Sequence, residues 1–261
     1  MTNPPPAGTV IYPDLAGKVA VVTGGSRGIG AATASALAAN AVDVAVVGRD
    51  RNAIASVVTR ITSSGGSAMG MVADCTIEAD LTALRQEVDA AFGRVDIVVP
   101  FAGGDGMPVP TTAEDPRHWR RVVESDLTSC FLTISTFLPD LINSGSAAIV
   151  TMASAAARQA AQSSAAYAAA KAGVVALTRH LARELAGEGI RVNCVAPSAV
   201  ENDKMRSWTS EEQRRQLPAS FPLGRIGQPD DDVAATLFLA SHASSWITGI
   251  TLDIAGGKTM I

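Results

Sequence analysis

The sequence predicts an α/β fold in which helices cover both faces of a parallel β-sheet. Short apolar runs of strand length alternate with helix-length segments along the 261 residues, which is the order that parallel sheets produce. Several of these runs lack a polar alternate face, as strands do when both of their sides are covered. The length suits one large domain, and apolar residues form 47 % of the chain, enough for a sizeable core.

Seven apolar runs are strand candidates, and segments with helical character stand between them. Several of the helical segments end at glycine or asparagine, a common C-terminal stop. The strand candidates are residues 18–24, 42–48, 67–73, 94–100, 146–152, 190–196 and 249–255. The helical segments are residues 28–40, 50–66, 76–93, 116–145 and 163–187.

Two segments stand outside this alternation. Residues 1–14 form a proline-rich arm, so the folded domain is expected to span residues 15–261. Residues from about 198 to 229 are the least regular part of that domain and contain three prolines. A long irregular insert in a compact domain is typical of a lid or binding loop, and we interpret it as the substrate loop.

Composition narrows the class of function. The formal net charge is −4 and no block of lysine or arginine is present, so nucleic acid is not an expected partner. No apolar stretch reaches the ~18 residues of a membrane span, and the start does not have the pattern of a signal peptide. Cys75, Cys130 and Cys194 lack paired metal-ligand spacing. We therefore expect no metal site, reduced thiols and a cytoplasmic protein.

The first strand candidate leads into a glycine-rich turn that opens a helix. Gly24, Gly28 and Gly30 follow a G-x-x-x-G-x-G spacing. Glycines permit a tight turn and let a pyrophosphate approach the free N–H groups at the helix start. Because the strand before and the helix after are both in place, this loop predicts a Rossmann-type, doubly wound domain that binds a dinucleotide.

The end of the second strand candidate indicates which dinucleotide. An NAD site usually has a carboxylate there to hold the ribose hydroxyls, whereas this sequence has Gly48. Arg49 follows it, and Arg27 lies in the phosphate loop; two guanidinium groups suit a 2′-phosphate. Asp50 is the one nearby acid. The pattern favours NADP over NAD.

Two reactive side chains stand four residues apart in an alanine-rich helix. Tyr167 and Lys171 therefore share one helix face, about 5–6 Å apart. A free phenol has a pKa of ~10, too high for proton exchange near neutrality, and an ammonium group ~4 Å away lowers the pKa of a phenol. Ser154 ends the fifth strand candidate and offers a hydrogen-bond donor for a carbonyl oxygen. Together the three residues predict hydride-transfer chemistry on a carbonyl group.

These motifs resemble those of the short-chain dehydrogenase/reductase family. "TGGSRGIG" is similar to the family's cofactor loop, and Ser154, Tyr167 and Lys171 are similar to its catalytic serine and Tyr-x-x-x-Lys. "RVNCVAP", "PLGRIGQPDDDVA" and "FLASHASSWITG" resemble later family segments, so the likeness runs from about residue 15 to the C-terminus. Within the family the chain most resembles β-ketoacyl-carrier-protein reductases and related ketone reductases. The resemblance implies a seven-stranded sheet and a homotetramer.

The resemblance also implies a role for each site residue. Tyr167 would donate a proton to the carbonyl oxygen, Lys171 would favour the phenolate and bind the nicotinamide ribose, and Ser154 would orient the carbonyl. Asp126 aligns with a helix asparagine that supports a proton relay, and Asp74 with an aspartate that contacts adenine. The implied cofactor contacts are Gly24, Ser26, Arg27, Gly28, Ile29, Gly30, Arg49, Asp74, Cys75, Ala102, Gly103, Tyr167, Lys171, Pro197, Val200 and Asn202.

Some positions depart from the family pattern and keep other functions open. Pro100, Asp126, Ser198 and Asn202 replace the usual residues. The first expectation is NADPH-dependent reduction of a ketone or β-ketoacyl carbonyl, with a small-molecule carbonyl or an acyl thioester as substrate. One alternative is NAD-dependent oxidation of a secondary alcohol. Another is a catalytically weak protein that senses the cofactor or acts as a scaffold.

Overall fold

The computed structural model describes residues 10–261, except for the side chains at positions 203, 204 and 208. A single sheet of seven strands lies at its centre, and every neighbouring pair of strands is parallel. The strand order is β3-β2-β1-β4-β5-β6-β7, which confirms the predicted fold class. The strands are β1 (Val19–Thr23), β2 (Asp43–Gly48), β3 (Ser67–Val72), β4 (Ile97–Pro100), β5 (Ala147–Met152), β6 (Ile190–Pro197) and β7 (Thr251–Ile254).

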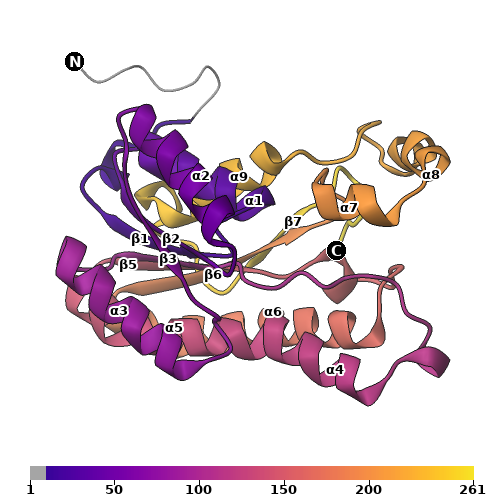
Figure 1. Ribbon diagram of the computed structural model, residues 1–261, viewed down its shortest axis with the longest axis horizontal. Helices are drawn as coiled ribbons and strands as arrows, with labels where there is room; N and C mark the ends of the chain where they lie inside the picture. The colour runs from indigo at the N-terminus through magenta and orange to yellow at the C-terminus, as the bar shows by residue number, and fades with distance from the viewer. Residues whose placement is uncertain (1–9) are drawn as a thin grey trace.

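Helices form a layer on each side of the sheet (Figure 1). One layer contains α1 (Gly28–Ala39), α2 (Arg51–Ser63) and α9 (Pro229–Ala240). The other contains α3 (Glu78–Phe92), α5 (Ser129–Ser144) and α6 (Ala165–Leu185), with α4 (Pro116–Val123) packed against α6. The segment that the sequence presents as one helix, residues 116–145, is divided by a π-helical turn at Glu124–Thr128.

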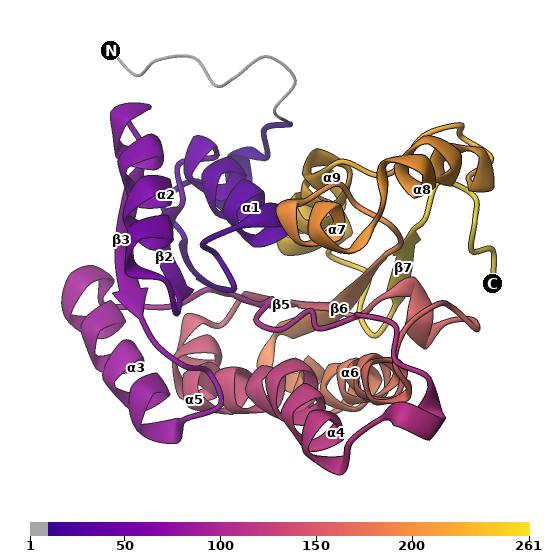
Figure 2. The same cartoon turned by 45° about the vertical axis from the view of Figure 1, so that its right-hand side comes forward.

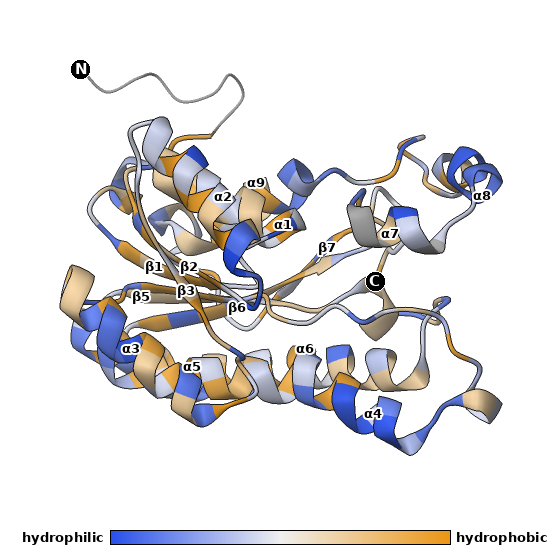
Figure 3. Cartoon of the chain, viewed as in Figure 1, coloured by the Kyte–Doolittle hydropathy of each residue, from blue (hydrophilic) through white to orange (hydrophobic). Residues whose placement is uncertain are grey.

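The core consists of two apolar layers, and alternate residues of each strand contribute to opposite layers. All five residues of β1 are buried. Val19 and Val21 pack with α3, α5 and α6, whereas Ala20 and Val22 pack with α1, α2 and α9. Figure 3 shows the same pattern as apolar strands between helices with polar outer faces. Covering on both sides explains why the strand sequences lack a polar alternate face.

The expected substrate loop is more regular than its sequence indicates. It contains two short helices, α7 (Asp203–Trp208) and α8 (Glu211–Gln216). Asn202 caps α7 by accepting a bond from the Met205 N–H, and Ser210 forms a capping box with Gln213 in α8. Figure 2 shows both helices on the same side of the sheet as α9. The chain that follows α8 meets the C-terminal segment, where the Gly256 carbonyl accepts a bond from the Leu223 N–H.

The described part of the N-terminal arm contacts the domain. The Tyr12 N–H donates to Asn40 Oδ1, the Asn40 amide donates to the Val10 carbonyl, and Leu15 is fully buried. Residues 1–9 of the predicted arm lie outside the described residues, and the boundary at residue 15 stays a prediction. Within residues 10–261, no helix has the length and apolar character that crossing a membrane requires.

Candidate active site

The predicted site residues gather at one edge of the sheet. In a parallel sheet the carboxyl ends of all strands lie at the same edge, and ligands bind where the strand order reverses, here between β1 and β4. Gly24 to Gly30 follow β1, Arg49 follows β2, and Asp74 and Cys75 follow β3; Ala102 and Gly103 follow β4, Ser154 follows β5, Tyr167 and Lys171 lie in α6, and Pro197, Val200 and Asn202 end or follow β6.

Two glycines of the phosphate loop are required by close backbone contacts. Gly24 has a φ of +64°, and a Cβ there would lie 2.5 Å from the Phe101 carbonyl oxygen. A Cβ on Gly30 would lie 2.2 Å from the Gly24 carbonyl oxygen. Any larger residue at either position would displace the loop from the first turn of α1.

The start of α1 has the features of a phosphate site. The side chain of its N-cap residue, Arg27, makes no capping bond. A Cβ on Gly28, the first helical residue, would meet no atom within 4 Å. The leading N–H groups of a helix need partners from outside the helix, and they favour an anion. The open space at Gly28, together with Ser26 and Ile29 beside it, therefore fits the pyrophosphate of a dinucleotide.

An ion pair that the sequence did not reveal joins the phosphate loop to the segment after β2. Arg27 Nη2 lies 2.5 Å from Asp50 Oδ2, and Asp50 Oδ1 accepts bonds from the Asn52 and Ala53 N–H groups at the start of α2. These backbone bonds and the Arg27 charge hold the pKa of Asp50 below its usual value. Aspartate is a preferred N-cap residue, so the position of Asp50 at the start of a predicted helical segment was the sequence signal for this role. Beside it, Ser26 Oγ occupies the space where a side chain at Gly48 would begin.

Asp74 and Cys75 follow β3 near Arg49. Asp74 Oδ1 accepts bonds from the Thr76 N–H and hydroxyl, at 3.0 and 2.7 Å. The Thr76 N–H, with a smaller contribution from the Arg49 charge, holds the pKa of Asp74 below its usual value. Cys75 is buried, and burial raises the pKa of its thiol to about 11. Among residues 10–261, no three histidine, cysteine, aspartate or glutamate side chains form a group that could hold a metal ion.

The segment after β4 adapts to the unusual Pro100. Proline has no N–H to donate. After it, the Phe101 N–H donates to the Val99 carbonyl and the Ala102 N–H donates to Thr23 Oγ1. Phe101 is 8 % exposed and belongs to the core. The proline is therefore accommodated without loss of the strand.

Lys171 is the centre of the predicted catalytic cluster. Its side chain is 5 % exposed, and Nζ donates to the Met152 carbonyl at 3.1 Å. Nζ also lies 3.1 Å from Asp126 Oδ1 and 5.7 Å from the centre of the Tyr167 ring. The structure thus places two other predicted catalytic residues, Asp126 and Tyr167, near the buried Lys171 ammonium group.

The Asp126 carboxylate joins this cluster to the segment after β4. Its side chain is fully buried; Oδ1 accepts a 2.6 Å bond from the Gly104 N–H, and Oδ2 accepts a bond from the Ser125 hydroxyl. Burial would raise the pKa of Asp126, but the Lys171 charge and these hydrogen bonds bring it below its usual value. Burial likewise opposes the charge of Lys171, but Asp126 raises the pKa of Lys171 above its usual value. Both groups are therefore charged.

Ser154 and Tyr167 are fixed by local hydrogen bonds. Ser154 Oγ accepts a bond from the Ala156 N–H in a short 3₁₀ helix (Ala155–Ala157) that packs against α6. The Tyr167 N–H donates to Ser164 Oγ, the N-cap of α6. Gly106 lies beside the Tyr167 ring, and a Cβ added to this glycine would come within 3.2 Å of a ring carbon.

The residues after β6 form the base of the expected substrate loop. Val200 is buried and pairs with Gly227 in an isolated parallel bridge. Asn202 Oδ1 caps α7, and its Nδ2 donates to the Val200 carbonyl. Pro197 is the last residue of β6. These contacts hold both ends of the loop at the edge of the sheet.

Comparison with known proteins identifies the family. The sequence model of the family described as "Enoyl-(Acyl carrier protein) reductase" matches residues 24–259. The chain is 35 % identical to the 3-oxoacyl-[acyl-carrier-protein] reductase FabG of Chlamydia pneumoniae, over 94 % of this chain and 98 % of that protein. It is also 35 % identical to the 7alpha-hydroxysteroid dehydrogenase of Escherichia coli (strain K12), over 93 % of this chain and 94 % of that protein.

A solved structure agrees with the sequence comparison. A 7 alpha-hydroxysteroid dehydrogenase complexed with NADH and 7-oxo glycochenodeoxycholic acid superposes with a TM-score of 0.89. It shares 34 % identity, and the match covers 94 % of this chain and 96 % of that one. The expected resemblance and the expected ketoreductase relatives are thereby confirmed. The chain belongs to the short-chain dehydrogenase/reductase family, whose members are oxidoreductases acting on CH–OH and C=O groups.

Proposed function

We propose that this protein reduces a ketone or β-ketoacyl carbonyl to a secondary alcohol with NADPH, and that Tyr167 is the proton donor. The observation that carries the proposal is the buried, charged Lys171, 5.7 Å from the Tyr167 ring. This pair lies at the same sheet edge as the glycine loop. A cation near a phenol favours proton release from it, which proton donation to a carbonyl oxygen requires.

Each protein group has a separate task in this reaction. The bound cofactor supplies the hydride. The Tyr167 hydroxyl gives its proton to the carbonyl oxygen, and the Lys171 cation stabilises the phenolate that remains. Ser154 Oγ already accepts a bond from the Ala156 N–H, so its own O–H is available to donate to the same carbonyl oxygen and hold it in place.

Asp126 acts as a positioning residue in this proposal. It does not take part in proton transfer to the substrate. Its Oδ1 atom contacts Lys171 Nζ and also accepts the bond from the Gly104 N–H. The Met152 carbonyl holds Nζ from a second direction. An ammonium group has three donors, so one remains to face the phenol or the cofactor ribose.

The preference for NADPH rests on Arg27 and Arg49. Both follow strands β1 and β2 at the adenosine end of the expected site, and no acid occupies position 48. The Arg27–Asp50 pair favours a second candidate, an NAD-linked alcohol dehydrogenase, because Asp50 competes with a 2′-phosphate for the guanidinium group. The relative solved with NADH points the same way.

The substrate class follows from the relatives. One acts on a 3-oxoacyl group attached to a carrier protein, and another on a hydroxysteroid. We accordingly propose a small-molecule carbonyl or an acyl thioester as substrate.

A homotetramer and a cytoplasmic location belong to the same proposal. A monomeric mass by light scattering at micromolar concentration would contradict the tetramer.

The test is cofactor oxidation by the purified protein, with NADPH and NADH in parallel. The substrates are an acetoacetyl thioester, a β-keto ester, an aryl ketone, a diketone and a 7-oxo steroid. The proposal expects turnover with NADPH, at least tenfold more efficient than with NADH for the best substrate. Turnover with NADH but not with NADPH would favour the dehydrogenase alternative and reject the proposed preference for NADPH. Tight cofactor binding without turnover on any substrate would favour a sensing role.

A further inference from the structure

The segment from residue 103 to 110 lies against the catalytic tyrosine, and we call it the 103–110 loop. Gly106 lies beside the Tyr167 ring, because a Cβ added to this glycine would come within 3.2 Å of a ring carbon. The Gly104 N–H is held by Asp126, whereas Met107, one residue beyond Gly106, is 44 % exposed. The loop is therefore attached at its start, and its contact with Tyr167 depends on what holds Asp105 and Gly106.

His118 is the residue that faces this part of the loop. It lies on α4 with its side chain 16 % exposed, and its two ring nitrogens face two different carboxylates. Nε2 lies 3.8 Å from Asp105 Oδ2 in the loop. Nδ1 lies 3.1 Å from Glu114 Oε1. An imidazole between two carboxylates is attracted to both only when it carries a proton on each nitrogen.

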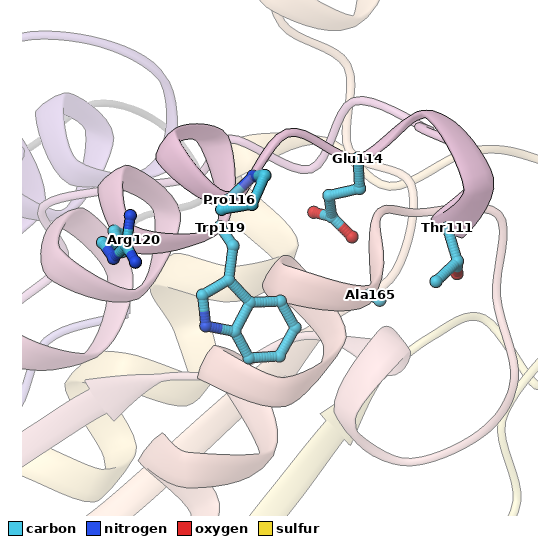
Figure 4. A pocket seen from close by; sticks show the side chains of 6 residues that line it. All are labelled: Thr111, Glu114, Pro116, Trp119, Arg120 and Ala165. Carbon is cyan, nitrogen blue, oxygen red and sulfur yellow. The ribbon is translucent and has the colours of Figure 1, made fainter.

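Glu114 connects His118 to the catalytic helix. Its side chain is 5 % exposed, and Oε1 also accepts a 3.4 Å bond from the Ala166 N–H, one residue before Tyr167. Figure 4 shows the Glu114 carboxylate between Trp119 and Thr111, close to Ala165 at the start of α6, in a pocket of about 270 Å³. His118 thus links Asp105 of the 103–110 loop to Glu114, whose carboxylate accepts a bond from the first turn of α6.

We propose that His118 is a positioning residue that fastens the 103–110 loop over the active site, and that the fastening requires the protonated imidazole. Its effect on turnover depends on the function proposed above; its effect on the loop does not. Neither carboxylate partner belongs to the predicted catalytic set, and neither does His118.

The surrounding charges determine how strongly protonation of His118 changes its attraction to the 103–110 loop. Asp105 from the loop and Glu114 from the turn before α4 both attract the protonated ring. Arg121 of α4 lies 3.8 Å from the same Asp105 oxygen, so it keeps part of the attraction when His118 is neutral. On the neighbouring α6, the Lys171 charge is already paired with Asp126. Loss of the proton therefore loosens the loop without releasing it.

The experiment compares His118→Gln with His180→Gln. His180 is the control because it also pairs with a glutamate four residues away, Glu184, at 3.2 Å, although in the reverse order along the chain, and its side chain is 75 % exposed on α6. Hydrogen exchange of the peptide that spans residues 103–110 is measured at pH 6 and pH 8, as protection relative to the intrinsic rate at each pH. Steady-state kcat and KM for the best carbonyl substrate are measured at the same two pH values, and thermal melts confirm that both variants fold.

We expect the wild type and His180→Gln to protect residues 105–107 about two- to fivefold more at pH 6 than at pH 8, the size that one partly exposed ion pair gives. KM should be lower at pH 6 by a similar factor, with a smaller change in kcat. His118→Gln should show the weaker protection and higher KM at both pH values. Equal protection in all three proteins at both pH values would overturn the proposal. A His118-dependent change in protection in a protein without carbonyl reductase activity would support the fastening role and reject the proposed function.

Discussion

Asp126 and Lys171 form a buried ion pair, with Lys171 Nζ 3.1 Å from Asp126 Oδ1 and side chains 0 % and 5 % exposed. The pair connects the π-helical turn between α4 and α5 to the helix that carries Tyr167. Two charges removed from water depend on each other, since either one alone would be stranded in the core. The Lys171 ammonium group, to which we assign a catalytic role, is thus held by contacts with a distant part of the fold.

Removing one member of this pair should destabilise the fold. Asp126→Ala leaves the Lys171 charge buried without its partner, and we expect a loss of roughly 3–5 kcal/mol in the free energy of unfolding. Asp126→Asn keeps an oxygen for the Gly104 N–H and should cost less than Asp126→Ala. Urea unfolding near pH 7 measures both values. An Asp126→Ala protein within 1 kcal/mol of the wild type would show that Lys171 is not charged in the core.

Asp232 should make stability depend on pH. It lies in the first turn of α9, fully buried, and within residues 10–261 neither carboxylate oxygen has a hydrogen-bond partner. Burial, with repulsion from Asp231, raises the pKa of Asp232 to about 8, against about 3.9 in an unfolded chain. As the pH rises from about 4 to 8, the unfolded chain loses this proton while the folded protein keeps it, so the folded state loses stability over that window.

Asp232→Asn removes this dependence because an amide does not titrate. Relative to Asp232→Asn, the wild type should lose roughly 2–4 kcal/mol in free energy of unfolding between pH 5 and pH 8. Urea unfolding at pH 5, 6.5 and 8 measures the difference. Asp230→Asn, at the rim of a groove between α1, α2 and α9, is the neighbouring control. Parallel curves for the wild type and Asp232→Asn would contradict the prediction.

The adenosine end of the site should determine cofactor choice. Arg49→Ala removes a cation near the expected 2′-phosphate and should lower kcat/KM for NADPH by about ten- to a hundredfold, with little change for NADH, since charge-assisted bonds to phosphate contribute a few kcal/mol. Asp50→Asn should shift the preference further toward NADPH because it frees Arg27. Both are measured by initial rates with each cofactor. An unchanged NADPH to NADH ratio in both variants would place the discrimination elsewhere.

The sequence was sufficient for the fold because the strand signal is strong. All five residues of β1 and all four of β4 are buried on both sides, so both appear in the sequence as unbroken apolar runs. The glycine loop was equally readable, because its glycines stand between a strand and a helix that the sequence also predicts. Gly30 is required by the nearby Gly24 carbonyl, whereas Gly24 is required by the distant Phe101. Helices α7 and α8 were not predicted, because they are short and are stabilised by caps at Asn202 and Ser210 rather than by an apolar stripe.

Contacts between distant segments could not be predicted from the sequence. Asp126 and Lys171 are separated by 45 positions, and the ion pair depends on a π-helical turn that has no sequence signal. The Arg27–Asp50 pair depends on how the phosphate loop faces α2. The bridge from Asp105 through His118 to Glu114 joins a loop to α4 and to the turn before α4. In each case the sequence shows the charged residues, but tertiary packing determines which of them form pairs.

The most direct test of the proposed reaction is NADPH-dependent carbonyl reduction by Tyr167→Phe beside Tyr12→Phe, since the chain has only these two tyrosines. Cofactor affinity is measured in parallel by fluorescence titration. The account predicts that Tyr167→Phe binds NADPH within about threefold of the wild type but loses at least a hundredfold in kcat, the usual contribution of a general acid, while Tyr12→Phe keeps full activity. A Tyr167→Phe protein with wild-type turnover would show that another group donates the proton.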